Sequence, residues 1–109
     1  MFPLQLALLT VLTAATTVAV AASAAAAPIK VACVGDSITA GYLASNASMK
    51  YPARLQVKLD AKFGNGSYIV SNFGAGGATV QKGADSPYWN RTQFGQWVNG
   101  TYDIVVMML

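Results

Sequence analysis

Two short stretches of this sequence hold the residue types that nucleophilic chemistry needs. Gly35-Asp36-Ser37 directly follows the apolar run 29–34, and the glycine-dense segment 74–79 directly follows a second apolar run. A serine at the end of a buried strand lies where the chain must turn, so its hydroxyl can project from the edge of a sheet. Ser37 is therefore a candidate nucleophile. The alternative is that Asp36 or Ser37 only caps the next helix, which both residue types do well.

The glycine-dense segment can supply the second part of such a site. A serine that attacks an ester needs backbone N–H groups aimed at the oxygen that becomes negative. Glycine lets the backbone approach that oxygen closely because it has no side chain. In an open α/β sheet, ligands bind beyond the carboxyl ends of the strands, so the turn at Ser37 and the loop 74–79 can face one crevice.

The apolar patterning predicts the elements that would hold these two stretches. Tyr51, Leu55, Leu59 and Phe63 recur at every fourth position, which is typical of an amphipathic helix. The whole pattern predicts strands at 29–34, 68–73 and 103–109 and helices at 51–63 and 92–98. Apolar strands that alternate with helices indicate a parallel sheet with helices on both sides. We expect an α/β fold, a three-layer α/β/α arrangement with a flavodoxin-like sheet, of which the first three strands are present.

Residues 1–27 predict a leader that is separate from the domain at 28–109. They contain no charged residue and no glycine, and they end in small residues. These features indicate a secretory signal peptide, with an uncertain cleavage site because a basic start is missing and Pro28 follows. The alternative is an uncleaved anchor, since the apolar stretch approaches the length of a bilayer span. Its Ala and Thr content favours cleavage, and hence a secreted protein with no stable membrane association.

The asparagines and the cysteine also fit an exported protein. Four of the five asparagines lie in N-glycosylation sequons, an excess that suggests a eukaryotic secretory protein. They are Asn46, Asn65, Asn90 and Asn99. Cys33 is the single cysteine, so no internal disulfide can form. Its place within an apolar run predicts a small buried side chain and not a reactive thiol.

Charge and motif spacing argue against two other classes of protein. The net charge is +3, and the lysines and arginines are scattered instead of clustered, which does not predict a nucleic-acid partner. The glycines at 74, 76 and 77 follow a predicted strand, but their spacing is not that of a dinucleotide-binding loop, and no acidic residue follows about 20 positions later. We therefore predict no cofactor and no metal site.

The two stretches together resemble the SGNH, or GDSL, hydrolase superfamily of esterases and lipases. Residues 35–39, GDSIT, are similar to the first block of that family, which implies that Ser37 is the nucleophile and an oxyanion donor. Residues 72–79, NFGAGGAT, are similar to the second block, which implies that the backbone N–H of Gly77 also donates to the oxyanion hole. The two blocks at this spacing are far more specific than Gly-Asp-Ser alone.

The resemblance covers nearly all of residues 29–109 but only about the first half of a family domain. The run 103–109 resembles the strand before the third block, whose asparagine is a further oxyanion donor. The triad Asp and His of the fourth block are absent from this chain, which contains no histidine. Asp36 adjoins the nucleophile in sequence, so we interpret it, with Gly35, as support for the turn. A serine hydroxyl needs an adjacent base, so we expect a truncated, inactive piece of a secreted esterase.

The substrate is indicated by the segment 82–90, which is similar to secreted family members that act on carbohydrate or sialate O-acetyl esters. This implies a small-molecule or glycan ester as substrate, with Tyr88 and Trp89 as candidate contacts. The alternative for these aromatics is ordinary packing against the sheet. For the function, the alternatives are a lipid or generic short-chain ester hydrolase and, in another class, a non-catalytic glycan-binding protein on the same fold. The oligomeric state stays open.

Overall fold

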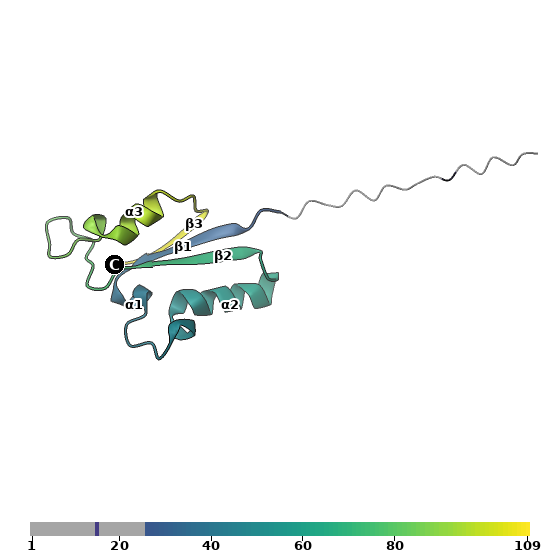
Figure 1. Cartoon of the computed structure of the whole chain (residues 1–109), viewed down its shortest axis with the longest axis horizontal. Coiled ribbons are helices and arrows are strands. Elements are labelled where there is room, and N and C mark those ends of the chain that lie inside the picture. The colour runs from purple at the N-terminus through teal and green to yellow at the C-terminus, as the bar shows by residue number, and fades with distance from the viewer. Residues whose placement is uncertain (1–14, 16–25) are drawn as a thin grey trace, which may run out of the picture.

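The structure, a computed structural model, describes Ala15 and residues 26–109, and its centre is a parallel sheet (Figure 1). The predicted signal peptide therefore lies outside the described residues, except for Ala15, Ala26 and Ala27. In chain order the elements are β1 (Ile29–Gly35), α1 (Ser37–Ala40), η1 (Ala47–Met49), α2 (Tyr51–Phe63), β2 (Tyr68–Gly74), η2 (Tyr88–Asn90), α3 (Thr92–Val98) and β3 (Ile104–Met108).

The α/β fold predicted from the patterning is confirmed, down to the bounds of both long helices. α2 has Pro52 in its first turn, where proline fits, and it ends at Gly64, which has φ +91° and donates its N–H to Asp60 O at 2.9 Å. β1 and β2 each run one residue past the predicted end. α1 is the helix that the capping alternative expects after Asp36 and Ser37. The short helices η1 and η2 were not predicted, because three residues carry no measurable periodicity.

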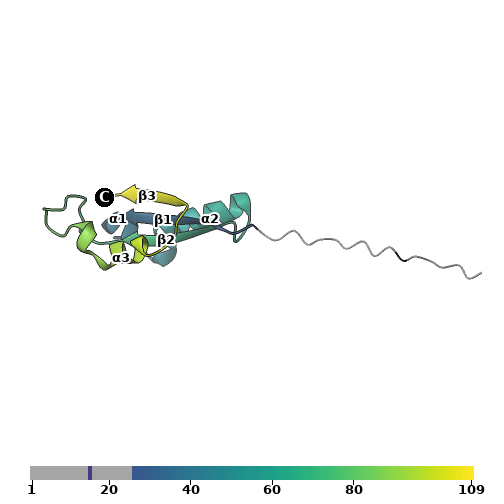
Figure 2. The same ribbon diagram turned by 90° about the horizontal axis from the view of Figure 1, so that it is seen from above.

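The strand order is β2-β1-β3, all parallel, with β1 in the middle (Figure 2). This is the order in which the first three strands of a flavodoxin-like sheet lie. The chain steps from β1 to one side through α2, and then across β1 to the other side through α3. Right-handed crossovers in opposite directions leave the two helices on opposite faces, as Figure 1 shows.

The core is built around the middle strand. Residues 31–35 of β1 are buried, as expected for a strand covered on both faces. One face packs into a cluster that contains Ala32, Val34, Phe73, Ala75, Ala78 and Tyr88. Val31 and Cys33 alternate to the opposite face, under α1 and α2. This packing makes the carboxyl end of β1 a rigid base for the turn that follows.

The two edges of the sheet differ. On β2, the side-chain amide of Gln56 covers the backbone, because its Nε2 donates to Tyr68 O at 2.9 Å and its Oε1 accepts from Val70 N at 2.7 Å. On β3, all five residues are apolar and 37–49% exposed, and within residues 26–109 no helix covers them. No helix among the described residues has the length and apolarity to span a bilayer.

Candidate active site

Ser37 is the first residue of α1 and lies at the sharp turn that ends β1. Asp36 is the N-cap of α1, because its Oδ1 accepts from Ile38 N at 2.9 Å. The Asp36 N–H donates in turn to Met108 O at 3.3 Å, which ties the turn to β3. Asp36 therefore caps α1 and joins the turn to β3, and its support of a nucleophile turn stays a prediction. Ser37 itself is partly exposed.

Gly35 supports the same turn by leaving room for it. A Cβ at this position would overlap Thr39 Oγ1 and would lie 2.5 Å from Met108 O. Any larger residue would therefore push α1 away from the sheet. The glycine before the serine lets the first turn of α1 pack directly on the carboxyl end of β1.

Gly77 lies in the loop that follows β2. The loop begins with a hydrogen bond from Ala75 N to Gly35 O at 2.8 Å, and Ala78 N then donates to Ala75 O at 3.1 Å, which closes a β-turn. Gly77 is the third residue of this turn and has φ +72°, which other residues adopt only with strain. A Cβ at Gly77 would meet no atom within 4 Å, so the loop is open on this side.

Ser37 and Gly77 lie at the same end of the sheet, the end at which its parallel strands finish. β1 and β2 are adjacent, with Gly35 in register with Gly74, so Ser37 and Gly77 follow the carboxyl ends of neighbouring strands. Within residues 26–109, neither the Ser37 N–H nor the Gly77 N–H donates a hydrogen bond, whereas the N–H groups of Ile38 and Ala78 are both used. Among the described residues, both N–H groups are therefore free to donate to a ligand atom at this end of the sheet.

The structure corrects the expectation that Tyr88 contacts substrate. Tyr88 is fully buried, its Oη donates to Phe73 O at 2.8 Å, and burial raises the pKa of its phenol. Its ring makes edge contacts with Trp89 and Phe94, at centroid distances of 6.1 and 6.2 Å. Trp89 is half-buried in the same cluster and donates its indole N–H to Val80 O at 2.8 Å. Tyr88 therefore packs against the sheet, the ordinary alternative for these aromatics.

Large apolar side chains are instead exposed directly after Ser37. Ile38, Tyr42 and Leu43 are 61%, 73% and 87% exposed. The Tyr42 N–H donates to Ser37 O at 2.8 Å, so this loop begins beside the serine. Leu43 has φ +61°, which is uncommon for a bulky residue. These three residues were not predicted from the sequence, because exposure of single apolar residues leaves no periodic signal.

The buried layer below α1 is polar but offers no second nucleophile. Thr39 is fully buried, and its Oγ1 donates to Tyr51 Oη at 3.3 Å. Burial raises the pKa of the Tyr51 phenol. Burial also raises the pKa of the Cys33 thiol, and a hydrogen bond with Tyr51 offsets only part of that rise. A raised pKa keeps Cys33 as the neutral thiol, which is a poor nucleophile.

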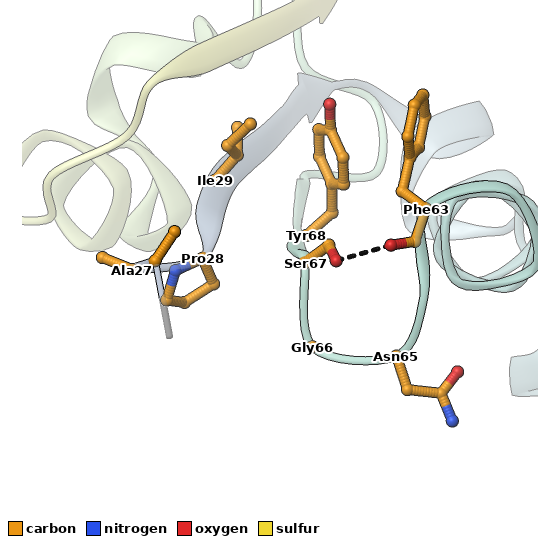
Figure 3. A pocket seen from close by; sticks show the side chains of 9 residues that line it. Ala27, Pro28, Ile29, Phe63, Asn65, Gly66, Ser67 and Tyr68 are labelled. Carbon is orange, nitrogen blue, oxygen red and sulfur yellow. Dashed lines mark hydrogen bonds between the residues drawn. The ribbon is translucent and has the colours of Figure 1, made fainter. Parts of the chain in front are cut away.

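No group of acidic, cysteine or histidine side chains in residues 26–109 is arranged to hold a metal ion. A hollow of about 910 Å³ lies at the amino ends of β1 and β2 (Figure 3). Phe63 and Tyr68 line one side of it, and Pro28 lines the other. This hollow is at the end of the sheet opposite to Ser37. The asparagines of the four sequons, Asn46, Asn65, Asn90 and Asn99, are all exposed.

Comparison with known proteins adds one relative. An acetylxylan esterase from Xylanibacter ruminicola (strain ATCC 19189 / DSM 19721 / CIP 105475 / JCM 8958 / 23) is 39% identical to this chain over 82 residues. That match covers 74% of this chain but only 16% of the esterase, so the chain spans less than a fifth of the length of this relative. No family model matches the chain, and no solved structure matches it. The chain is thus similar to a short part of an esterase.

Proposed function

We propose that this chain carries the nucleophile and two oxyanion donors of a secreted serine esterase of the SGNH type. One observation carries the proposal. Ser37 and Gly77 follow adjacent parallel strands at the same end of the sheet, and their backbone N–H groups are both free within residues 26–109. The similarity to the first two SGNH blocks and to an acetylxylan esterase supports it.

The reaction follows from these positions. Ser37 Oγ attacks the acyl carbon and forms the new C–O bond while its proton passes to a base. The electron pair of the carbonyl moves to its oxygen, and the N–H groups of Ser37 and Gly77 donate to that oxyanion. Collapse of the intermediate expels the alcohol, which takes up the proton, and leaves an acetyl group on Ser37 Oγ. Water then releases acetate by the same steps.

The base must be supplied from outside this chain, in the proposal, because the 109 residues contain no histidine. The chain would then be one part of a longer protein, and we expect it to be inactive by itself. Removing a triad member can cost about 10⁶ in kcat. The product of the whole reading frame that contains this chain is called the complete protein in the experiments below.

The substrate that we propose is an O-acetylated polysaccharide such as xylan, as the name of the relative suggests. A lipid or generic short-chain acyl ester is the second candidate. Ile38, Tyr42 and Leu43 favour it, because exposed apolar side chains next to the nucleophile could hold an acyl chain.

The test is to measure acid release by the complete protein from acetylated xylan and from a long-chain acyl ester. We expect acetate release from the xylan, and loss of that activity in Ser37→Ala. Faster release from the long-chain ester would favour the second candidate. Binding of the glycan without hydrolysis would indicate a non-catalytic glycan-binding protein, and full activity in Ser37→Ala would end the proposal.

A further inference from the structure

The nucleophile helix α1 lies directly on the backbone of the sheet. A Cβ at Gly74 in β2 would overlap Ala40 N and would lie 2.6 Å from Ala40 Cα and from the carbonyl carbon of Thr39. α1 has only four residues, and a helix this short has too few internal hydrogen bonds to hold itself in place. Its position must therefore be set by contacts with the sheet.

One side chain makes that contact from the strand that leads to Gly77. Asn72 Nδ2 donates to Thr39 O at 2.8 Å, and Asn72 Oδ1 accepts from Gly74 N at 2.8 Å. The first bond holds the last turn of α1, whose carbonyls lack helical partners. The second holds the residue at which β2 passes into the glycine loop. Asn72 thus bridges the two segments that carry Ser37 and Gly77.

The bridge requires the chemistry of an amide. A primary amide presents one acceptor and two donor hydrogens, so it can satisfy a carbonyl and an N–H at the same time. A carboxylate of the same shape can accept from Gly74 N but has no hydrogen to donate to Thr39 O. Asn72 is also the one asparagine of the chain outside a sequon.

We propose that Asn72 is a positioning residue, which fixes the nucleophile helix against the glycine loop and so sets the distance between Ser37 and the Gly77 N–H. This inference rests on the proposed function of those two residues. Asn72 touches neither the hydroxyl nor the N–H groups, and it acts through Thr39 and Gly74. A misplacement of about 1 Å in a catalytic arrangement can cost on the order of 100-fold in rate.

Gln56 provides a matched control for the same strand. Its side-chain amide also bridges a helix to the β2 backbone, through Tyr68 O at 2.9 Å and Val70 N at 2.7 Å, but at the far end of the strand from Ser37. Asn72→Ala removes two side-chain amide hydrogen bonds, whereas Gln56→Ala removes its two bonds to β2 and a third bond, from Nε2 to Asp60 Oδ1 at 2.9 Å, so the control loses at least as many hydrogen bonds. Only Asn72→Ala removes a contact between α1 and the strand that leads to Gly77.

The experiment measures kcat, KM and the urea unfolding midpoint of the complete protein for wild type, Asn72→Ala, Asn72→Asp and Gln56→Ala. We expect kcat on an aryl acetate to fall on the order of 100-fold in both Asn72 variants, with KM unchanged. We expect wild-type kcat in Gln56→Ala, even where its unfolding midpoint falls as far as that of Asn72→Ala. Equal kcat values for Asn72→Ala and Gln56→Ala would overturn the inference.

A second measurement separates this inference from the proposed function. The amide ¹H–¹⁵N resonances of Ser37 and Gly77 report their local geometry whether or not the protein hydrolyses an ester. If the wild type is inactive on every ester, the proposed function fails. The positioning inference would still stand if both resonances shift in Asn72→Ala and not in Gln56→Ala, and unshifted resonances in Asn72→Ala would overturn it.

Discussion

The substitution Gly77→Ala tests the geometry of the glycine loop. Gly77 has φ +72°, and a residue with a Cβ pays about 1–2 kcal/mol to adopt the left-handed region. Because a Cβ here would meet no atom within 4 Å, this cost is conformational and not steric. The loop can relieve it by rotating the backbone, which turns the Gly77 N–H away from the position that we propose for the oxyanion. Losing one oxyanion donor costs about 10²–10³ in kcat.

We therefore expect Gly77→Ala to lose about 100-fold or more in kcat but no more than about 2 kcal/mol in the free energy of unfolding. The assay is aryl acetate hydrolysis and urea unfolding by the complete protein. Gly76→Ala is the control, because Gly76 is exposed, has no positive φ and would likewise place its new methyl group more than 4 Å from any other atom. Wild-type kcat in Gly77→Ala, or the same loss in Gly76→Ala, would refute the reasoning.

Three further predictions concern the core, the cysteine and the surface of the complete protein. Tyr88→Phe removes the hydroxyl that donates to the buried Phe73 O, so we expect about 0.5–1.5 kcal/mol less unfolding free energy in urea and an unchanged KM for acetylated xylan; a raised KM at unchanged stability would contradict this. Burial raises the pKa of the Cys33 thiol in the folded protein. The neutral buried thiol therefore leaves the free energy of unfolding unchanged below the ordinary thiol pKa of about 8.5, and that free energy falls as the pH rises further. We expect slow labelling of Cys33 by a disulfide reagent at pH 7 and fast labelling only after unfolding; fast labelling of the native protein would argue against the burial. After secretion from a eukaryotic cell, we expect a mass that falls on N-glycosidase treatment and loses one glycan in each Asn→Gln variant of Asn46, Asn65, Asn90 and Asn99; an unmodified mass would contradict the sequon prediction.

The elements that sequence predicted correctly are those whose signal is local. α2 follows from apolar residues four apart and from Gly64 at its end, and the strands follow from short apolar runs. Tyr88 shows the limit of this approach, because an aromatic residue after a turn has the same local pattern whether its ring is exposed or buried. Only the packing of the loop on β2 decides that, and here it buries Tyr88.

The sequence indicates the candidate residues of the site, but not the contacts that connect them. Ser37 and Gly77 stand out in the sequence because they lie in the short segments that follow two apolar runs. Asn72 lies in one of those runs, yet its role depends on Thr39, 33 positions away in the sequence. The exposure of Tyr42 and Leu43 likewise depends on how the loop after α1 leaves the sheet. Contacts of this kind come from tertiary structure and have no signature in composition or periodicity.

The most direct test of the account is covalent labelling of the nucleophile. A fluorophosphonate phosphonylates a serine only where that serine is activated by a base and its oxyanion is stabilised. After treatment of the complete protein, peptide mass spectrometry should place the adduct on Ser37, with no adduct in Ser37→Ala and none on this 109-residue chain alone. An adduct on another serine, or equal labelling of Ser37→Ala, would contradict the assignment of Ser37 as the nucleophile.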